Sequence, residues 1–470
     1  MWTSFMRWQT GWSGRSKSVK FSIMRLATSF IFLLVTALNA ATLKQATPQD
    51  YRLLLATLEA GDTLVLAAGV YERGLPVSDC HGTSEAWITI QGPDEGVAEI
   101  RQTAVANCVE LKQCSHIALK KLSILGGGPQ GISGLFGISA QGGLKNSVHH
   151  ILIEDCLMSD WNTSQQAVGI STKTPTWDWT IRRNVIRNCG TGLYLGNSNG
   201  ADPFIRGVIE HNLVENPIGY CMEIKFQMPR PELPDMPTSA SRTIIRHNVF
   251  IKNDAPSPDG DRANLLVGGF PDSGPGSDDL YEIYGNFFWH NPRESLLQAS
   301  GRVSIHDNVF ADCPAHAAIT LRDHDLPVKL AHIYNNTICA AACGIRIPTT
   351  PAQGHAIIGN VVFAAEPLRL HRSISSVVEN VTGTVADAAL HLVNPQMTLD
   401  TLDLRPKPGR CEGTPLDLAA FANETAFDVD FGETSKGARR FRGAYVIPAA
   451  GPGWMPKAGI KPSSAPKSKF

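Results

Sequence analysis

The stretch IRRNVIRN at residues 181–188 returns in varied form through the middle of the chain. It reads IEHNLVEN at 209–216, IRHNVFIK at 245–252 and IHDNVFAD at 305–312. Each copy has an apolar residue, two variable residues, and then an Asn directly before an apolar pair. Repeats with a period of tens of residues are the signature of solenoid proteins, so this phrase decides the fold.

One asparagine marks each repeat, and the marker asparagines recur at intervals of 20 to 38 residues. They are Asn184, Asn212, Asn248, Asn286, Asn308, Asn336, Asn360 and Asn380. Short intervals suit one coil of a right-handed parallel β-helix, and longer intervals suit a coil with an outward loop. The segments around each Asn alternate as strands do, whereas Asn, Gly and β-branched residues disfavour helical repeats. We therefore expect an all-β, right-handed, single-stranded parallel β-helix.

The marker asparagines have an expected structural role. Asn tolerates the left-handed backbone conformation of a tight turn, and stacked amides on successive coils can form a ladder. The repeat extends backwards as IEDCLMSD at 153–160, where we place Asp155 at the Asn position. A helix over 47–60, with Thr47 as its N-cap, is expected to cover the open N-terminal coil, because an exposed coil presents unpaired backbone groups.

The ends of the chain have different compositions from the repeats. Residues 30–38, FIFLLVTAL, follow basic residues and precede small ones, which is the layout of a secretory signal peptide. Secretion or periplasmic location is therefore expected, with a retained membrane anchor as the alternative. The expected divisions are an extension before the true start at 1–23, a signal peptide at 24–41, the β-helix with its N-terminal cap at 42–390, a C-terminal end or cap at 391–448 and a disordered tail at 449–470.

Composition limits the partners. The net charge of −1 carries no signature of nucleic-acid binding, and we expect a monomer with no stable membrane span after processing. Ten cysteines in an exported chain invite disulfides, but several recur at matching repeat positions and suit a stacked apolar core. At most one or two bridges are expected, with Cys80, Cys108 and Cys114 as the foremost candidates. No Cys/His spacing resembles a zinc site.

Two phrases resemble the pectate-lyase-like β-helix superfamily. GDTLVLAAGVY at 61–71 is similar to the first coil of such proteins, and FDVDFGETSKGARRFRGAY at 427–445 resembles their terminal phrase. The resemblance implies the β-helix fold with a capping helix. It does not select an activity, because that superfamily contains lyases, hydrolases, epimerases and proteins of no known activity.

A second strand follows each marker Asn after a short turn, and this strand provides the candidate site. Placing its apolar pairs inward sends the alternate residues outward in two columns. The first column is Tyr194, Glu223, Leu266, Gln298, Thr320, Arg346 and Arg369. The second is Gly196, Lys225, Gly268, Ser300, Arg322, Pro348 and His371. Arginines can hold carboxylates in bidentate pairs, so these columns suit an acidic polysaccharide; the alternative is an ordinary solvated face.

Lys225, in YCMEIKFQ, resembles the catalytic lysine strand of the alginate lyase and chondroitinase B group. The resemblance implies that Lys225 is the base, that Glu223 supports it or binds calcium, and that an Arg assists. Arg322 lies in the most similar phrase, but several coils away, roughly 14 Å by coil spacing. Arg246, in the marker strand, is the alternative. Acidic residues also gather in loops at 259–261 and 272–279, which suit either calcium, the one candidate cofactor, or an ordinary solvated loop.

These observations leave three functions open. The first is a secreted polysaccharide lyase acting on a uronate-containing polysaccharide by β-elimination, with Lys225 and Arg322 as catalytic residues. Its substrate would be bound by Glu223, Gln298, Arg346, Arg369, His371 and Tyr194. The second is a glycoside hydrolase of the same fold using Asp323 and Asp325. The third is a non-catalytic glycan-binding or surface protein.

Overall fold

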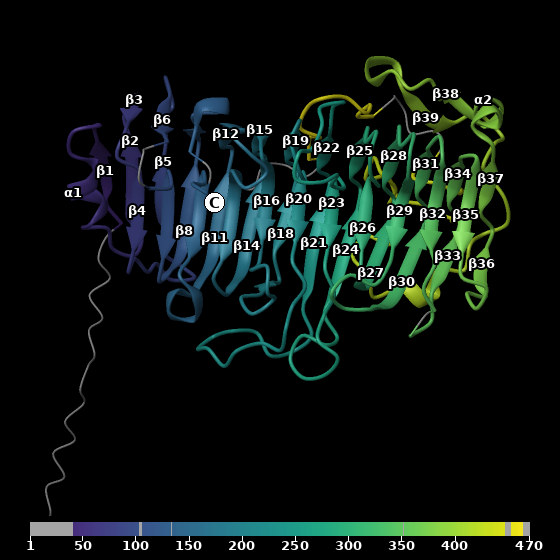
Figure 1. Cartoon of the computed structure of the whole chain (residues 1–470), viewed down its shortest axis with the longest axis horizontal. Coiled ribbons are helices and arrows are strands. Elements are labelled where there is room, and N and C mark those ends of the chain that lie inside the picture. Colours follow the sequence, from purple (N-terminus) through teal and green to yellow (C-terminus); the bar gives the residue numbers. More distant parts are fainter. Residues whose placement is uncertain (1–40, 103–105, 133, 351, 447–452, 464–470) are drawn as a thin grey trace, which may run out of the picture. The chain divides into compact units, whose positions relative to one another are not determined.

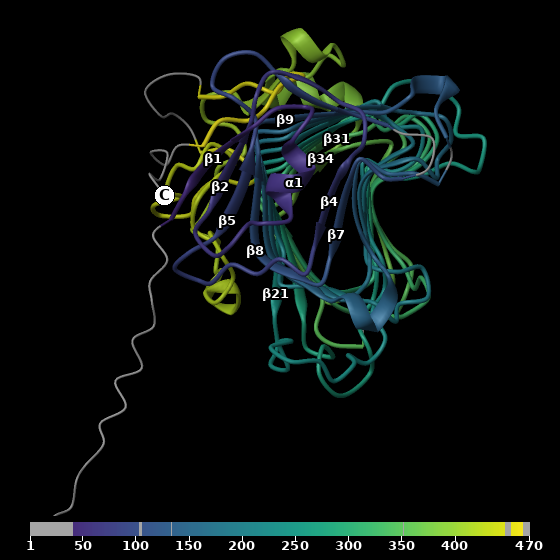
Figure 2. The same cartoon turned by 90° about the vertical axis from the view of Figure 1, so that its left-hand side faces the viewer.

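The computed structural model describes residues 41–102, 106–132, 134–350, 352–446 and 453–463. These residues form three long parallel sheets that wind as a right-handed β-helix, so the expected fold class is confirmed (Figure 1). Seen along the solenoid, the sheets are the three sides of the coil (Figure 2). The expected signal peptide and the extension before it lie, up to residue 40, outside the described residues.

Each coil contributes in turn one strand to sheet A, one to sheet B and one to sheet C. Sheet A contains β1 (Leu43–Ala46), β2 (Thr63–Leu66), β5 (Ile88–Gln91), β8 (Cys114–Lys120), β11 (Val148–Glu154), β14 (Thr176–Arg182), β17 (Phe204–Ile205), β18 (Val208–Glu210), β21 (Arg242–Arg246), β24 (Leu280–Tyr284), β27 (Gly301–His306), β30 (Val328–Tyr334), β33 (Ala356–Ile358) and β36 (Ser376–Val378). Sheet B contains β3 (Gly69–Tyr71), β6 (Ala98–Arg101), β9 (Leu122–Leu125), β12 (Leu157–Trp161), β15 (Val185–Cys189), β19 (Leu213–Glu215), β22 (Val249–Ile251), β25 (Phe287–Trp289), β28 (Val309–Ala311), β31 (Thr337–Cys339), β34 (Val361–Phe363) and β37 (Val381–Gly383). Sheet C contains β4 (Leu75–Ser78), β7 (Val109–Lys112), β10 (Ile138–Gln141), β13 (Val168–Lys173), β16 (Thr191–Leu195), β20 (Met222–Ile224), β23 (Leu265–Val267), β26 (Leu297–Ala299), β29 (Ala317–Leu321), β32 (Cys343–Ile347) and β35 (Glu366–Leu370).

The remaining elements are short. They are α1 (Tyr51–Leu55), α2 (Ala388–His391), the antiparallel pair β38 (Leu392–Asn394) and β39 (Asp403–Pro406), and single 3-10 turns at Gly128–Gln130, Gly143–Asn146, Val385–Asp387, Leu399–Thr401 and Ala419–Phe421. Within the described part of the chain, no helix is both long and apolar enough to cross a bilayer.

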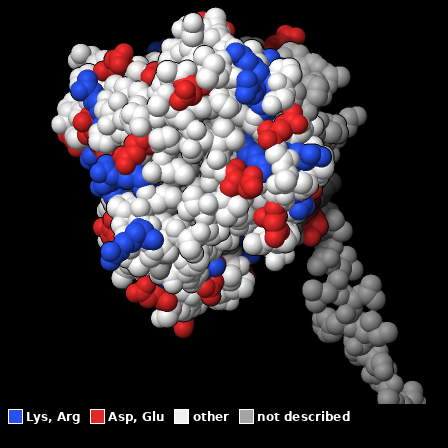
Figure 3. Space-filling view, turned by 90° about the vertical axis from the view of Figure 1, so that its right-hand side faces the viewer, with Lys and Arg blue, Asp and Glu red and all other residues white. Residues whose placement is uncertain are grey.

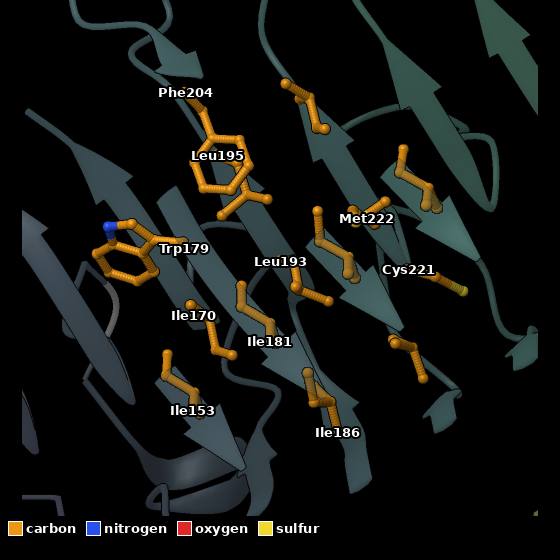
Figure 4. Packing of buried hydrophobic residues seen from close by; sticks show 14 of the residues in the cluster. Ile153, Ile170, Trp179, Ile181, Ile186, Leu193, Leu195, Phe204, Cys221 and Met222 are labelled. Atoms are coloured by element: carbon orange, nitrogen blue, oxygen red, sulfur yellow. The ribbon is translucent and has the colours of Figure 1, made fainter. Parts of the chain in front are cut away.

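Inward-facing apolar residues fill the coils as the alternation predicts. Leu193 of β16 pairs with Ile170 of β13 on one side and Met222 of β20 on the other, and all three are fully buried. Figure 4 shows these side chains stacked with those of neighbouring coils. Burying each such side chain is worth about 1.5–3 kcal/mol, so the stack dominates stability. Only the last predicted inward pair, Leu368 and Leu370, is half-buried, because sheet C ends at β35.

The marker asparagines form the predicted ladder. The Nδ2 of Asn184 donates to the Oδ1 of Asn212 at 2.9 Å, and the Nδ2 of Asn212 donates to the Oδ1 of Asn248 at 2.9 Å. The same bond continues through each later marker to Asn380. Each backbone N–H also donates to the next Oδ1, as from Asn184 to Asn212 at 3.0 Å.

Two details of this turn differ from the sequence-based expectation. The left-handed residue is the one before the Asn, for example Arg183 with φ of 55°, so the Asn contributes its amide and not its backbone conformation. The position of Asp155 was also wrong by one. Glu154 pairs with Arg182, so Asp155 falls opposite Arg183, and the backbone N–H of Cys156 donates to the Oδ1 of Asn184. Cys156 therefore begins the ladder.

The N-terminal helix is shorter than expected. Helix α1 covers only Tyr51–Leu55, with Asp50 at its N-cap, whereas Thr47 bonds through its hydroxyl to Asp50. The rest of 47–60 forms turns around it. Tyr51 packs edge-on against Tyr71 at 5.0 Å and donates from its hydroxyl to the carbonyl of Gly74. Even this short helix therefore covers the core of the first coil (Figure 2).

All ten cysteines are buried free thiols, so the expected bridge among the early cysteines is absent. Most lie within the apolar core of the coils, as Cys189 and Cys313 do; Cys339 and Cys411 lie in the cluster on the outer side of sheet B, and Cys343 lines the groove on sheet C. The stacking interpretation of these residues is the one that the structure supports.

A C-terminal arm, residues 403–446, runs back along the solenoid. Phe421 stacks on Tyr334 of sheet A at 4.3 Å, while Phe431 packs in a cluster with Phe287 of sheet B. The Tyr334 hydroxyl donates to Glu424 at 2.9 Å. Figure 2 shows the arm beside the strands of sheet A and away from β4 and β7. Sheets A and B are therefore covered over their later coils, and the outer face of sheet C is left to other uses.

Residues 453–463, predicted to be part of a disordered tail, are ordered and packed on the coils. Lys461 is 2 % exposed and donates from Nζ to the carbonyl of Gly285 at 2.9 Å and to the carbonyl of Phe431. The composition of this segment suggested disorder, but the buried lysine finds several acceptors, and Trp454 and Ile460 pack against the apolar cluster that contains Phe287 and Phe431.

The end of the β-helix near β35 to β37 carries charges of both signs, intermixed and without a large patch of one sign (Figure 3). This distribution agrees with the net charge of −1.

Candidate functional site

A groove runs along the outer face of sheet C. It consists of two hollows of about 490 Å³ and about 400 Å³ that share Glu294, Gln298 and Arg322. The first is lined by Gln165, Gln166, Val168, Lys173, Thr191, Tyr194, Ser198, Gly219, Tyr220, Glu223, Lys225, Asp261, Arg262, Glu294, Gln298, Arg322 and His324. The second is lined by Glu294, Ser295, Gln298, Ala315, His316, Ala317, Thr320, Arg322, Ala342, Cys343, Arg346, Glu366 and Arg369. These residues belong to the coils and their loops, and none belongs to the C-terminal arm.

Strand register places the first predicted column along this groove. Its residues pair in the order Tyr194, Glu223, Leu266, Gln298, Thr320, Arg346 and Arg369. Register is strict because a slip by one residue would exchange the core residues for these polar ones. Tyr194, Glu223, Gln298, Arg346 and Arg369 all line the groove.

Lys225 lines the larger hollow and directly follows β20. Its Nζ donates to Glu223 Oε1 at 2.9 Å, and the two side chains are 14 % and 6 % exposed. Alternation along one strand brings this pair to the same outer face. The arrangement is a partly buried ion pair whose ammonium still borders the groove.

Arg322 lines the same hollow, although β20 and β29 are three coils apart, roughly 14 Å at the usual strand spacing. The gap predicted from the sequence is therefore real, and the hollow spans it. Arg322 is exposed, and among the described residues no carboxylate forms an ion pair with it. Its guanidinium is available to an anion in the groove.

Arg346 and Arg369 continue the basic side beyond Arg322. They are paired in register on neighbouring strands, so they lie about 4.8 Å apart along the solenoid. Arg369 is exposed and lies 3.6 Å from Glu366, a separation at which a surface ion pair is weak.

Sequence reasoning missed several groove residues. Lys173 lies one coil before Gly196 and two coils before Lys225, at the same register position. Extending the second column by one coil towards the N-terminus would therefore have found this groove residue. Tyr220 and Arg262 come from loops, and the Arg262 guanidinium lies 5.8 Å from the Tyr220 ring. Glu294 also comes from a loop, and no repeat pattern marks it.

Burial alters the acidity of the tyrosines in the groove. It raises the pKa of Tyr194 to about 12, with the Glu223 carboxylate adding to the effect. Burial also raises the pKa of Tyr220, again with Glu223 adding to the effect. Both phenols are therefore neutral hydroxyls at physiological pH. They can donate hydrogen bonds to a ligand, and neither is a phenolate base in the resting groove.

Other predicted residues lie elsewhere. His371 follows the end of β35, bonds to Ser373 Oγ at 2.7 Å, and does not line the groove. Asp323 accepts from the backbone N–H of Val328, and Asp325 lies 2.9 Å from His324 Nδ1. Only His324 of that group reaches the groove. Both aspartates stabilise their own loop.

Arg246 and the acidic loop at 272–279 also lie away from the groove. Arg246 belongs to a ladder of charges on sheet A, where it pairs with Glu210 at 2.6 Å. Asp279, in the acidic loop, is buried and forms an ion pair with Arg230. Neither is a groove residue.

The described residues contain one group with the spacing of metal ligands, His211, His247 and Glu433. It lies at the corner between sheets A and B, under the tail. Lys461 Nζ lies 3.2 Å from His247 Nδ1. When Lys461 carries its proton, its ammonium donates to Nδ1, and Nε2 then holds the imidazole proton facing Glu433 at 3.2 Å. We interpret the group as a buried hydrogen-bonded chain.

Calcium therefore stays a prediction for the groove itself. Its carboxylates are Glu223, Asp261, Glu294 and Glu366. Glu223 already accepts from Lys225, so the loop carboxylates Asp261 and Glu294 are the better oxygen ligands for a hard cation in the larger hollow.

No protein-family model matches the chain, and a search of curated proteins found no significant match. Solved structures share its fold. A pectate lyase, Pel9A, is 11% identical over 77% of this chain and 86% of its own, with a TM-score of 0.47. The A-module of a mannuronan C-5 epimerase from Azotobacter vinelandii is 15% identical over 69% and 88%, with a TM-score of 0.46. An alginate lyase from a Paenibacillus species is 13% identical over 73% and 99%, with a TM-score of 0.41. At such identities the likeness concerns the fold alone.

Proposed function

We propose that the protein is a polysaccharide lyase that cleaves a uronate-containing polysaccharide in the groove of sheet C. The observation that carries this proposal is the row of cationic side chains along the groove, Lys225, Arg322, Arg346 and Arg369. Cationic groups arranged along a shallow groove suit a linear polyanion, because each can bind one carboxylate without desolvating the whole chain.

β-Elimination uses the same groups. As the neutral amine, after its ammonium has passed a proton to water, Lys225 Nζ removes the proton on the carbon next to the uronate carboxylate, and the electron pair of that C–H bond forms a carbon–carbon double bond. The glycosidic C–O bond on the adjacent carbon breaks, and the departing oxygen takes a proton from water. Arg322 neutralises the carboxylate, whose negative charge grows in the transition state. Glu223, hydrogen-bonded to Lys225, orients its amine.

The activity is tested by incubating the purified protein with alginate, pectate and chondroitin, with and without calcium. Elimination produces an unsaturated uronate that absorbs ultraviolet light, so absorbance rises with time. The substitution Lys225→Ala should abolish this rise while leaving glycan affinity nearly intact. Unchanged turnover in that variant would remove Lys225 from the mechanism.

The chain offers a matched control for this substitution. Glu110 and Lys112 of β7 repeat the Glu-x-Lys spacing on the outer face of the same sheet, paired at 3.4 Å, but they do not line the groove. Lys112→Ala should leave turnover unchanged. Equal losses in both variants would show that the effect is a general loss of surface charge.

A glycoside hydrolase is the second candidate. Its two catalytic carboxylates would be Glu223 and Glu294, which line the larger hollow, because Asp323 and Asp325 do not line it. Hydrolysis adds one water to the products and forms no double bond, so product masses distinguish it from elimination. Glycan binding without any product would select the third candidate, a non-catalytic binding protein.

A further inference from the structure

Lys173 differs from the other groove cations in its surroundings. Its Nζ lies 4.9 Å from the centroid of the Phe136 ring and 5.5 Å from that of Tyr194. It ends β13 and is partly buried, and it lines the larger hollow. Two aromatic rings therefore form part of its surroundings, and the remaining side opens to the groove.

Across the described parts of the chain, other buried or half-buried lysines have strong acceptors. Lys225 pairs with Glu223, Lys436 pairs with Asp307 at 2.7 Å, and Lys252 donates to the carbonyl of Arg262 at 2.9 Å. No described residue accepts a hydrogen bond or forms an ion pair with Lys173. A desolvated cation is unfavourable unless it is paired, and burial accordingly lowers the pKa of Lys173.

This position makes Lys173 ready to accept an anion. The ring faces attract the ammonium electrostatically, but they do not accept hydrogen bonds as a carboxylate does. An anion arriving from the groove would supply that acceptor without displacing a protein carboxylate. Lys225 differs, because a substrate carboxylate must share its ammonium with Glu223.

Register fixes how far this position lies from Lys225. Lys173, Gly196 and Lys225 follow one another in the same outward column on three successive coils, so the two lysines are roughly 10 Å apart. Gly196 adopts φ of 86°, which favours glycine, and it places no side chain between them. A linear ligand can pass along this column from Lys225 to Lys173.

We propose that Lys173, together with the Phe136 and Tyr194 rings, is a subsite for the carboxylate of a second uronate residue, two coils away from Lys225. The inference rests on the proposed function, since it assumes that the groove binds a uronate polymer. It makes the substrate a run of uronates, because the uronate that reacts at Lys225 and the uronate whose carboxylate meets Lys173 belong to the same chain.

The test is calorimetric titration of the whole protein with oligouronates of increasing length at fixed salt. Lys173→Met keeps the length of the side chain and removes the charge, and Lys173→Arg keeps the charge. We expect Lys173→Met to weaken tetramer binding about tenfold or more and dimer binding by less than twofold. Lys173→Arg should bind within a fewfold of the wild type. Lys145→Met, at an exposed lysine outside the groove, is the control.

The outcomes separate the two proposals, because binding is measured without turnover. Unchanged tetramer binding by Lys173→Met, or equal losses for dimer and tetramer, overturns the subsite whether or not the wild type forms product. The expected length-dependent loss in a protein that forms no product keeps the subsite and removes the lyase. A wild type that binds no oligouronate overturns both. Circular dichroism of each variant ensures that the compared proteins are folded.

Discussion

The asparagine ladder should be a major source of stability in the central coils, and Asn248→Ala tests it. The Asn248 side chain is fully buried. Its Oδ1 accepts from the backbone N–H of Asn212 at 3.0 Å and from Asn212 Nδ2 at 2.9 Å. Its Nδ2 donates to the carbonyl of Ile209 at 2.9 Å and to Asn286 Oδ1 at 3.0 Å.

The cost follows from which groups keep another partner. Asn212 Nδ2 still donates to the carbonyl of Ile181, and Asn286 Oδ1 still accepts from the backbone N–H of Asn248. The backbone N–H of Asn212 loses its acceptor, and an unsatisfied buried donor costs about 1–3 kcal/mol. The two lost Nδ2 bonds add about 1 kcal/mol each. We therefore expect Asn248→Ala to lower the free energy of unfolding by roughly 3–5 kcal/mol.

The assay is urea unfolding followed by far-ultraviolet circular dichroism, with hydrogen exchange to locate the effect. Exchange should quicken most at the coils that contain Asn212 and Asn286, because each coil contacts only its neighbours. Asn253→Ala, in an exposed loop where the side chain accepts one bond from Ala255, is the control and should cost less than about 0.5 kcal/mol. A loss below about 1 kcal/mol for Asn248→Ala would refute the ladder argument.

Two further predictions concern the packed tail and the first coil. Lys461→Met should lower the free energy of unfolding by roughly 2–4 kcal/mol, because it removes the hydrogen bonds to His247 Nδ1 and to two buried carbonyls. Residues 453–463 should also become open to hydrogen exchange. The control is Lys457→Met, at an exposed position, and equal effects of the two substitutions would contradict the packed tail. In the first coil, burial alone would raise the pKa of Asp62, but hydrogen bonds from Lys44 and Thr42 hold it well below 3.8. Because its folded-state pKa is depressed, the stability that Asp62 contributes is present above pH 3.8 and is lost as the pH falls below it. The urea midpoint of Asp62→Asn should therefore be lower than that of the wild type at neutral pH, and the two midpoints should converge in acid. A difference between the two midpoints that stays constant with pH would show that the Asp62 carboxylate is not the cause.

The sequence was sufficient for the coils and for their register. A repeated Asn before an apolar pair, with period-two alternation on either side, allows one burial pattern, because a slip by one residue would bury charges such as Glu223 and Lys225. The order of the column from Tyr194 to Arg369 followed from that alternation. The local turn was less well determined. Two adjacent residues form this turn: the first adopts the left-handed backbone conformation, and the second, the Asn, contributes its side-chain amide to the ladder. Asp and Asn are common in both roles, so the sequence did not show that Asp155 occupies the first position and Cys156 the second.

Only the tertiary structure decided which face of the solenoid forms the groove. The arm at 403–446 covers parts of sheets A and B through contacts such as Phe421 on Tyr334, between residues far apart in the chain, and no local pattern encodes them. Tyr220, Arg262 and Glu294 come from loops whose paths depend on packing. The surroundings of Lys173 likewise depend on tertiary packing, which places the Phe136 and Tyr194 rings beside its ammonium. The packed tail has the same origin, since Lys461 is ordered by carbonyl groups that only the assembled coils and arm bring together. Local alternation determines where a side chain points, and long-range packing determines what it meets there.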